Sequence, residues 1–152
     1  MSRIIAFAFA VLFIFSCKED HVHEPGEHIE AEGLVILDEN DSVKVKIFRG
    51  IIDKSYGEKL IAVINSTSNP LRIKFLNNLQ HIIEPPTAPE YKLVWEISDP
   101  SIAEIQLYEK DNNKFKFTTT GLKIGESSVE FKLLHNDHTD FRSGSIPLET
   151  TD

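Results

Sequence analysis

The chain lacks most of the residues that could cross-link it or fit it to a polyanionic partner. Its 152 residues include a single cysteine, Cys17, so no disulfide can form within the chain. Basic residues are also in a minority, with 16 Lys and Arg against 24 Asp and Glu and a formal net charge of −8. Nucleic-acid binding needs clustered Lys and Arg to displace phosphate counterions, so the charge balance argues against a nucleic-acid partner.

No apolar run in the sequence is long enough for a stable membrane span. The longest, residues 4–15 (IIAFAFAVLFIF), would be about 18 Å long as a helix, well short of the ~30 Å hydrocarbon core. It follows the basic residue Arg3 and ends just before the charged residues Lys18-Glu19-Asp20. This layout is typical of a secretory signal, so residues 1–16 are predicted to be a signal peptide.

The residues at the end of this run carry a resemblance to bacterial lipoproteins. Ile14-Phe15-Ser16-Cys17 resembles a lipobox, the site where lipoprotein signal peptidase cuts before a diacylglyceryl-modified cysteine. The resemblance implies that Cys17 becomes a lipidated N-terminus, whose acyl chains, such as palmitate, form a strong membrane anchor. Lys18-Glu19-Asp20 resembles the surface-export signal of Bacteroidetes-type lipoproteins. That implies an outer-membrane protein that faces the periplasm or is exposed at the cell surface.

The mature chain divides into a polar arm and one domain. Residues 18–31 read KEDHVHEPGEHIEA, which contains only two large apolar residues, Val22 and Ile29. Such a segment cannot bury enough apolar surface to fold alone, so residues 17–31 are predicted to be the lipidated cysteine and a flexible, His-rich tether. Residues 32–152 are enough for one domain with a core of its own.

Short segments with strand character fill this domain. Val43, Val45 and Ile47 alternate with polar or outward residues, and Leu71, Ile73 and Phe75 do the same. Period-two alternation predicts half-buried strands. The predicted strands are residues 33–37, 43–48, 59–64, 71–76, 81–83, 91–97, 103–108, 114–119, 127–134 and 141–149. Pro85, Pro86 and Pro89 are predicted to mark a crossing between two sheets, and the whole pattern indicates an all-β sandwich.

The second half of the chain resembles a known family. Residues 94–105 (VWEISDPSIAEI) place Trp95 on a strand, followed by a Ser/Asp/Pro turn and a small apolar strand, and residues 121–129 (GLKIGESSV) place Gly121 and Gly125 before another strand. Both segments are similar to bacterial Ig-like domains of the second group. The resemblance implies an Ig-like antiparallel β-sandwich that acts as an extracellular spacer or adhesive module, without catalytic residues. Trp95 is expected to fill space between the two sheets.

Six histidines are the only residues that suggest metal chemistry. His21, His23 and His28 lie in the tether, His135 and His138 flank Asn136-Asp137, Asp140 follows closely, and His81 stands alone. Imidazoles with a carboxylate form a common coordination set for zinc, copper or nickel. The predicted metal site therefore draws on His21, His23, His28, His135, His138 and Asp140, while His81 is expected to have no ligand role. The open alternative is that the tether is solvated linker and Asn136-Asp137 an ordinary hairpin turn.

These features predict a non-enzymatic, lipid-anchored protein that binds a divalent metal at the cell envelope. The layout also resembles small lipoproteins regarded as accessories to outer-membrane metal uptake, which implies an outer-membrane transporter or another envelope protein as partner. The alternative is an adhesive or structural Ig-like module that uses no metal. A Ser-His-Asp hydrolase could be assembled on paper from Ser143 or Ser145 with His138 and Asp140, but no nucleophile elbow surrounds either serine.

Overall fold

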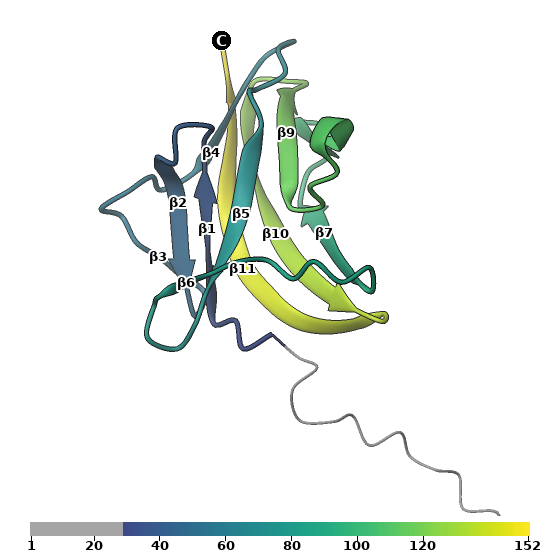
Figure 1. Cartoon of the computed structure of the whole chain (residues 1–152). Coiled ribbons are helices and arrows are strands. Elements are labelled where there is room, and N and C mark those ends of the chain that lie inside the picture. Colours follow the sequence, from purple (N-terminus) through teal and green to yellow (C-terminus); the bar gives the residue numbers. More distant parts are fainter. Residues whose placement is uncertain (1–28) are drawn as a thin grey trace, which may run out of the picture.

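A computed structural model describes residues 29–152, which form two packed β-sheets (Figure 1). The predicted signal peptide, Cys17 and nearly all of the predicted tether lie outside these described residues. The elements are β1 (Gly33–Leu37), β2 (Val43–Phe48), β3 (Ile51–Ile52), β4 (Leu60–Val63), β5 (Leu71–Leu76), β6 (Ile82–Ile83), β7 (Tyr91–Ile97), β8 (Ala103–Leu107), the 3-10 helix η1 (Glu109–Asp111), β9 (Lys116–Gly121), β10 (Gly125–His135) and β11 (His138–Thr151).

The strand order agrees with the predicted all-β, Ig-like sandwich. The larger sheet has the order β3-β2-β1-β5-β9-β8, with β6 also paired to β5, and the smaller sheet has the order β4-β11-β10-β7. All pairings between these strands are antiparallel except β4 with β11, which is parallel. In Ig terms, β5, β9 and β8 take the places of strands B, E and D, while β7, β10 and β11 take those of C, F and G.

The N-terminal strands extend one edge of this arrangement (Figure 1). β1 pairs with β5 over its whole length, and β2 and β3 continue the sheet outward. Both faces of β1 are covered: Leu34 and Ile36 face the main core, while Val35 and Leu37 belong to a second small cluster with Leu76. Lys46 and Lys74 flank Val35 in register, so their aliphatic stems help to cover this outer cluster.

Phenylalanines form the centre of the core. Phe75, Phe117 and Phe131 are essentially inaccessible to solvent, and the ring centroids of Phe117 and Phe131 are 5.0 Å apart. Trp95, expected to fill the space between the sheets, is only partly buried, although it packs beside Phe131 at a centroid distance of 6.4 Å. The reason is its strand: β7 is an edge strand, so one side of the indole lies at the open border of the sandwich.

The prolines lie at the predicted crossing between the sheets, and two glycines allow a close backbone approach and an unusual φ. The segment with Pro85, Pro86 and Pro89 connects β6 in the larger sheet to β7 in the smaller one, which confirms the predicted crossing. A Cβ on Gly121 would lie 2.6 Å from the carbonyl oxygen of Val63, so this glycine permits close approach of β4 and β9. Gly125 has a φ of +155°, which favours glycine, and begins β10.

Candidate functional site

The β10–β11 hairpin places the two predicted histidine ligands of the domain opposite one another. Its two-residue loop, Asn136-Asp137, has φ values of 46° and 69°, as a type I′ turn requires, and Asn is a favoured residue there. His135 and His138 are paired in register directly across this turn. Side chains of such a pair start from Cβ atoms about 4.5–5.5 Å apart, so the turn chemistry brings two imidazoles to one end of the sheet.

A β-bulge turns Asp140 toward the same place. Leu134 pairs with Thr139 but Leu133 pairs with Phe141, so Asp140 is an extra residue in β11. Simple alternation would place Asp140 and the neighbouring Phe141 on opposite faces, yet the side chain of Asp140 is only 4% exposed and Phe141 is also buried. A bulge re-aims the extra side chain and bends its strand, and the long curve of β11 is visible in Figure 1.

His135 is held between Tyr91, Asn136 and Asp140. The residue is 3% exposed, and its ring stacks on Tyr91 of β7 with centroids 4.3 Å apart and planes 8° apart. Its Nδ1 lies 3.8 Å from Asp140 Oδ2, and its Nε2 lies 3.3 Å from Asn136 Nδ2. An amide nitrogen can only donate, so this contact matches the tautomer in which Nε2 accepts and Nδ1 carries the proton.

This geometry separates the roles of the three predicted ligands of the domain. His138 is exposed, Nε2 of His135 faces the turn, and the carboxylate of Asp140 is buried behind the ring. Within residues 29–152, no group of three or more His, Cys, Asp or Glu side chains is placed to hold a metal ion. The hairpin thus offers two imidazoles and an orienting carboxylate, and any further ligand must come from elsewhere.

The remaining predicted site residues fall outside this cluster. His21, His23, His28 and Cys17 lie outside the described residues. His81 is exposed in the connection that precedes β6. Ser143 is buried, and its hydroxyl accepts the N–H of Phe131 at 3.0 Å and donates to the carbonyl of Gly144 at 2.6 Å, so it serves the backbone at a second bulge.

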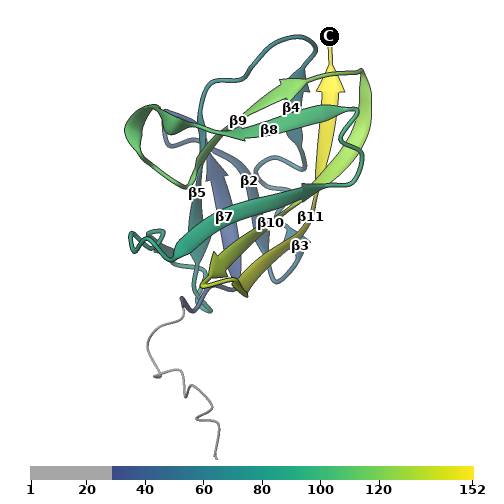
Figure 2. The ribbon, with the colours of Figure 1, turned by 90° about the vertical axis from the view of Figure 1, so that its right-hand side faces the viewer.

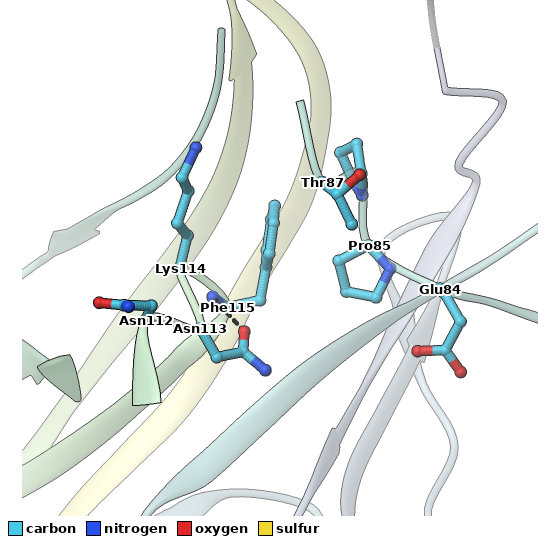
Figure 3. Close-up of a pocket in the computed structure, with 8 residues that line it drawn as sticks. Glu84, Pro85, Thr87, Asn112, Asn113, Lys114 and Phe115 are labelled. Atoms are coloured by element: carbon cyan, nitrogen blue, oxygen red, sulfur yellow. Dashed lines mark hydrogen bonds between the residues drawn. The ribbon is translucent and has the colours of Figure 1, made fainter. Parts of the chain in front are cut away.

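A hollow of about 430 Å³ lies between the segments 84–87 and 112–115 (Figure 3). Phe115 forms its floor, and it is itself a core residue whose ring meets Phe75 edge to face at 5.8 Å. The side chain of Asn113 accepts the N–H of Phe115 at 2.9 Å, while Lys114 and Glu84 point away from each other at the rim. No reactive side chains line the hollow, so we regard it as a surface depression at the edge of the core.

Sequence reasoning missed Tyr91 and Asn136 as parts of the histidine cluster. The turn preference of Asn136 was recognisable, but its amide contact to the neighbouring imidazole was not. Tyr91 reaches His135 only because β7 and β10 pair in the register that sets these residues side by side. No local signal in the sequence encodes that register.

Comparison of the chain with protein-family models and with curated proteins gives no match. In the described part of the chain, no helix is long and apolar enough to cross a membrane.

Proposed function

We propose that this protein is a lipid-anchored, non-enzymatic lipoprotein of the cell envelope that binds a divalent metal, zinc, copper or nickel. The observation that carries the proposal is the His135–Asp140 pair beside the directly opposed His138. A metal-binding histidine usually presents one ring nitrogen to the metal and donates the other N–H to a carboxylate, which fixes the ring. His135 is placed for such a role, since Asp140 Oδ2 lies on its Nδ1 side at 3.8 Å, a close approach that is longer than a hydrogen bond, and its Nε2 lies toward the turn.

In this proposal Asp140 orients a ligand and does not bind the metal itself. Its carboxylate is almost fully covered, whereas Asn136, which contacts Nε2, is exposed and can rotate away. Nε2 of His135 and a ring nitrogen of His138 then serve as two ligands. Zinc prefers four ligands in a tetrahedral set, so two positions remain for other groups.

The tether is the natural source of those groups. Both ribbon views place the first described residues at the same end of the sandwich as the β10–β11 hairpin, opposite the C-terminus (Figures 1 and 2). Ile29 and Ala31 pack against the core there, and His28 directly precedes them in the chain. An anchor on Cys17 would keep this end toward the membrane, where an outer-membrane transporter or another envelope protein could receive the metal.

Calorimetric titration of the full-length protein, purified in detergent, with Zn²⁺, Cu²⁺ and Ni²⁺ tests the proposal. We expect micromolar or tighter binding that His138→Ala weakens by about tenfold or more, because removal of one of two or three imidazoles removes a main ligand. His81→Ala is the matched control, since it removes an exposed turn histidine at no proposed site. Binding should also weaken in acid, because protons compete with the metal for the neutral imidazoles. Binding that ignores His138, or no binding of any of the three metals, would contradict the proposal.

A metal-free recognition module is the second candidate, and exposed apolar side chains favour it. Ile61 and Val63 of β4 and Leu122 and Ile124 of the β9–β10 turn are each 44–56% exposed. Ile64 bridges Gly121, so the β4 end and the β9–β10 turn are neighbours, away from the chain entry. Thermal denaturation separates the candidates: a metal that binds the native state raises the Tm, whereas this module predicts no change on addition of metal.

A further inference from the structure

A row of paired apolar residues crosses the outer face of the larger sheet. Ile82 pairs with Leu76, Leu76 with Gly33, Gly33 with Phe48, and Phe48 with Ile51. Directly paired residues project from the same face of a sheet, and Leu76 belongs to the outer cluster described above. A Cβ on Gly33 would lie 3.0 Å from Phe48 Cδ2, so the glycine leaves room for the phenylalanine ring. The row thus brings four apolar side chains together.

The ends of this row are open to solvent, although its middle is covered. Leu76 is 1% exposed, and Phe48 packs against its cluster and is partly buried. Ile51 and Ile82, at the two ends, are 74% and 52% exposed. A single exposed aliphatic residue is ordinary on a protein surface, but these two continue a covered apolar row and so form a patch.

The turn between β5 and β6 adds a third exposed aliphatic side chain. Leu79 in this turn is 68% exposed. The turn is well held, because the side chain of Asn77 accepts the N–H groups of Leu79 and His81, each at 3.0 Å. We call the following residues together the entry patch: Phe48, Ile51, Leu76, Leu79 and Ile82.

Charged groups around the entry patch are largely paired within the protein. Residues 76–83 (LNNLQHII) contain no Lys, Arg, Asp or Glu, although 26% of the chain is charged. Glu30 is exposed beside the patch and adds one negative charge. Three ion pairs flank the patch, Arg49 with Glu32, Lys74 with Glu84 and Lys46 with Asp53. The patch therefore has little charge to attract an ionic partner, and its attraction must come from apolar area.

The chain enters the domain beside this row. The N–H of Glu32 donates to the carbonyl of Leu76 at 2.8 Å, and the carbonyl of Glu32 accepts the N–H of Arg49 at 2.8 Å. Figure 2 shows the chain entering at the lower end of the domain, opposite the C-terminus. Eleven residues separate Ile29 from Cys17, so a lipid on Cys17 would hold this entry within about 40 Å of the bilayer.

We propose that the entry patch docks on the lipid bilayer that carries the anchor. Ile51, Leu79 and Ile82 then lie at the boundary between headgroups and acyl chains. A short tether gives an effective concentration on the order of millimolar, so a weak apolar contact is sufficient. The inference rests on the lipid anchor of the proposed function and is independent of the metal site.

The test uses the full chain, purified from bacterial membranes and reconstituted into vesicles of phosphatidylethanolamine and phosphatidylcholine. One added cysteine carries a nitrobenzoxadiazole label, either Asn78→Cys beside the patch or Lys123→Cys in the β9–β10 turn, both exposed. Lipids with a nitroxide on the acyl chain quench a label that lies close to them. We expect about threefold or more quenching at position 78 relative to position 123. Added phosphatidylglycerol should change this ratio little, because the contact is apolar.

Matched serine variants locate the contact. Ile51→Ser and Leu79→Ser should each lower the quenching at position 78 by about threefold, since each removes an exposed aliphatic side chain from the patch. Leu122→Ser and Ile124→Ser remove exposed aliphatic side chains away from the chain entry and should leave the quenching unchanged. Equal quenching of the two labels, no quenching at position 78, or equal effects of all four serine variants would overturn the proposal.

The unlabelled chain separates a failure of the anchor from a failure of the patch. A lipidated Cys17 has no free thiol and takes no label, and its protein floats with the vesicles. A reactive Cys17 would overturn the anchor and this inference with it. A blocked Cys17 and a floating protein without quenching at position 78 would keep the anchor and overturn the docking. A blue shift at position 78 that grows with protein density, without quenching, would assign the patch to a second copy of the chain and overturn the proposal.

Discussion

Tyr91 and His135 lie face to face across neighbouring strands, with ring centroids 4.3 Å apart and planes tilted by only 8°. The stack covers His135 at the open end of the smaller sheet and holds it against Asp140. Because the Tyr91 side chain is buried, with only 7% exposed, it contributes both to the core and to the candidate site. This shared position makes the stack the most direct link between stability and the proposed metal chemistry.

Tyr91→Ala should therefore lower the free energy of unfolding by about 3 kcal/mol, since it removes a large buried ring and leaves a cavity. Tyr91→Phe keeps the ring and should cost no more than about 1.5 kcal/mol, the value of one hydrogen bond. Urea unfolding followed by circular dichroism measures both. Equal losses in the two variants would mean that the hydroxyl, and not the stacked ring, stabilises this end of the sheet.

The second prediction concerns the centre of the core. Phe131 is inaccessible to solvent and meets both Phe117 and Trp95, whereas Trp95 is partly exposed at the sandwich edge. We expect Phe131→Ala to cost about 3–5 kcal/mol of unfolding free energy and Trp95→Phe to cost less than about 1.5 kcal/mol. Circular dichroism is the suitable probe, because the second variant loses the only tryptophan. A larger loss for Trp95→Phe would show that the indole, and not the phenylalanines, organises the core.

Gly121 provides a third test, at the contact between the two sheets. A Cβ there would lie 2.6 Å from both the Val63 carbonyl oxygen and the Thr150 methyl group. Gly121→Ala should cost about 1–3 kcal/mol, the usual range for an overpacked site. Gly50→Ala is a useful comparison, since Gly50 has a φ of +76° but nothing within 4 Å of the added Cβ. Its expected cost, from the backbone alone, is about 1 kcal/mol. Hydrogen exchange should show that Gly121→Ala loosens β4 first.

Acid pH should remove the contribution of the Asp38 carboxylate to the stability of the folded state. The hydrogen bond from Lys44, with those from the N–H groups of Ser42 and Asn40, lowers the pKa of Asp38 below its usual value of 3.8. A carboxyl with a lowered pKa in the folded state stabilises that state above the unfolded pKa, and the benefit is lost as the pH falls through the folded value. Asp38→Asn should thus lower the Tm at neutral pH, and the difference from the unchanged protein should shrink below about pH 4.

Glu39→Gln is the control for this prediction, because Glu39 is an exposed acid in the same turn. It should alter the Tm little at either pH. If Asp38→Asn and the unchanged protein differed by the same amount at neutral and acid pH, the ion pair with Lys44 would make no pH-dependent contribution to stability.

Most strands could be predicted because their signal is local. Residues 71–75 alternate apolar and basic side chains, and the structure has β5 over Leu71–Leu76. β3 was missed, since Ile51–Ile52 is too short to show a period. The parallel pairing of β4 with β11 was also beyond prediction, because it joins segments far apart in the chain whose register depends on the packed sheets.

In the candidate site, too, local features could be predicted from the sequence and features that depend on strand register could not. The turn at Asn136-Asp137 follows from residue preference, and with it the opposition of His135 and His138. The inward orientation of the Asp140 side chain could not be predicted from residue preference. Strand alternation, counted from the buried Phe141, places Asp140 on the outer face, and only the bulge turns its side chain inward. Asp140 was predicted as a ligand; its burial behind His135 instead supports an orienting role. The tether histidines lie outside the described residues, and their part stays a prediction.

The place of β11 between β4 and β10 has a consequence for how such a chain is made. β4 and β10 do not pair with each other, and residues 148–151 of β11 supply the partner that β4 needs. During synthesis the strands on both sides therefore emerge before the strand that joins them. Contacts of such long sequence separation form slowly, and the smaller sheet cannot be completed until β11 has emerged.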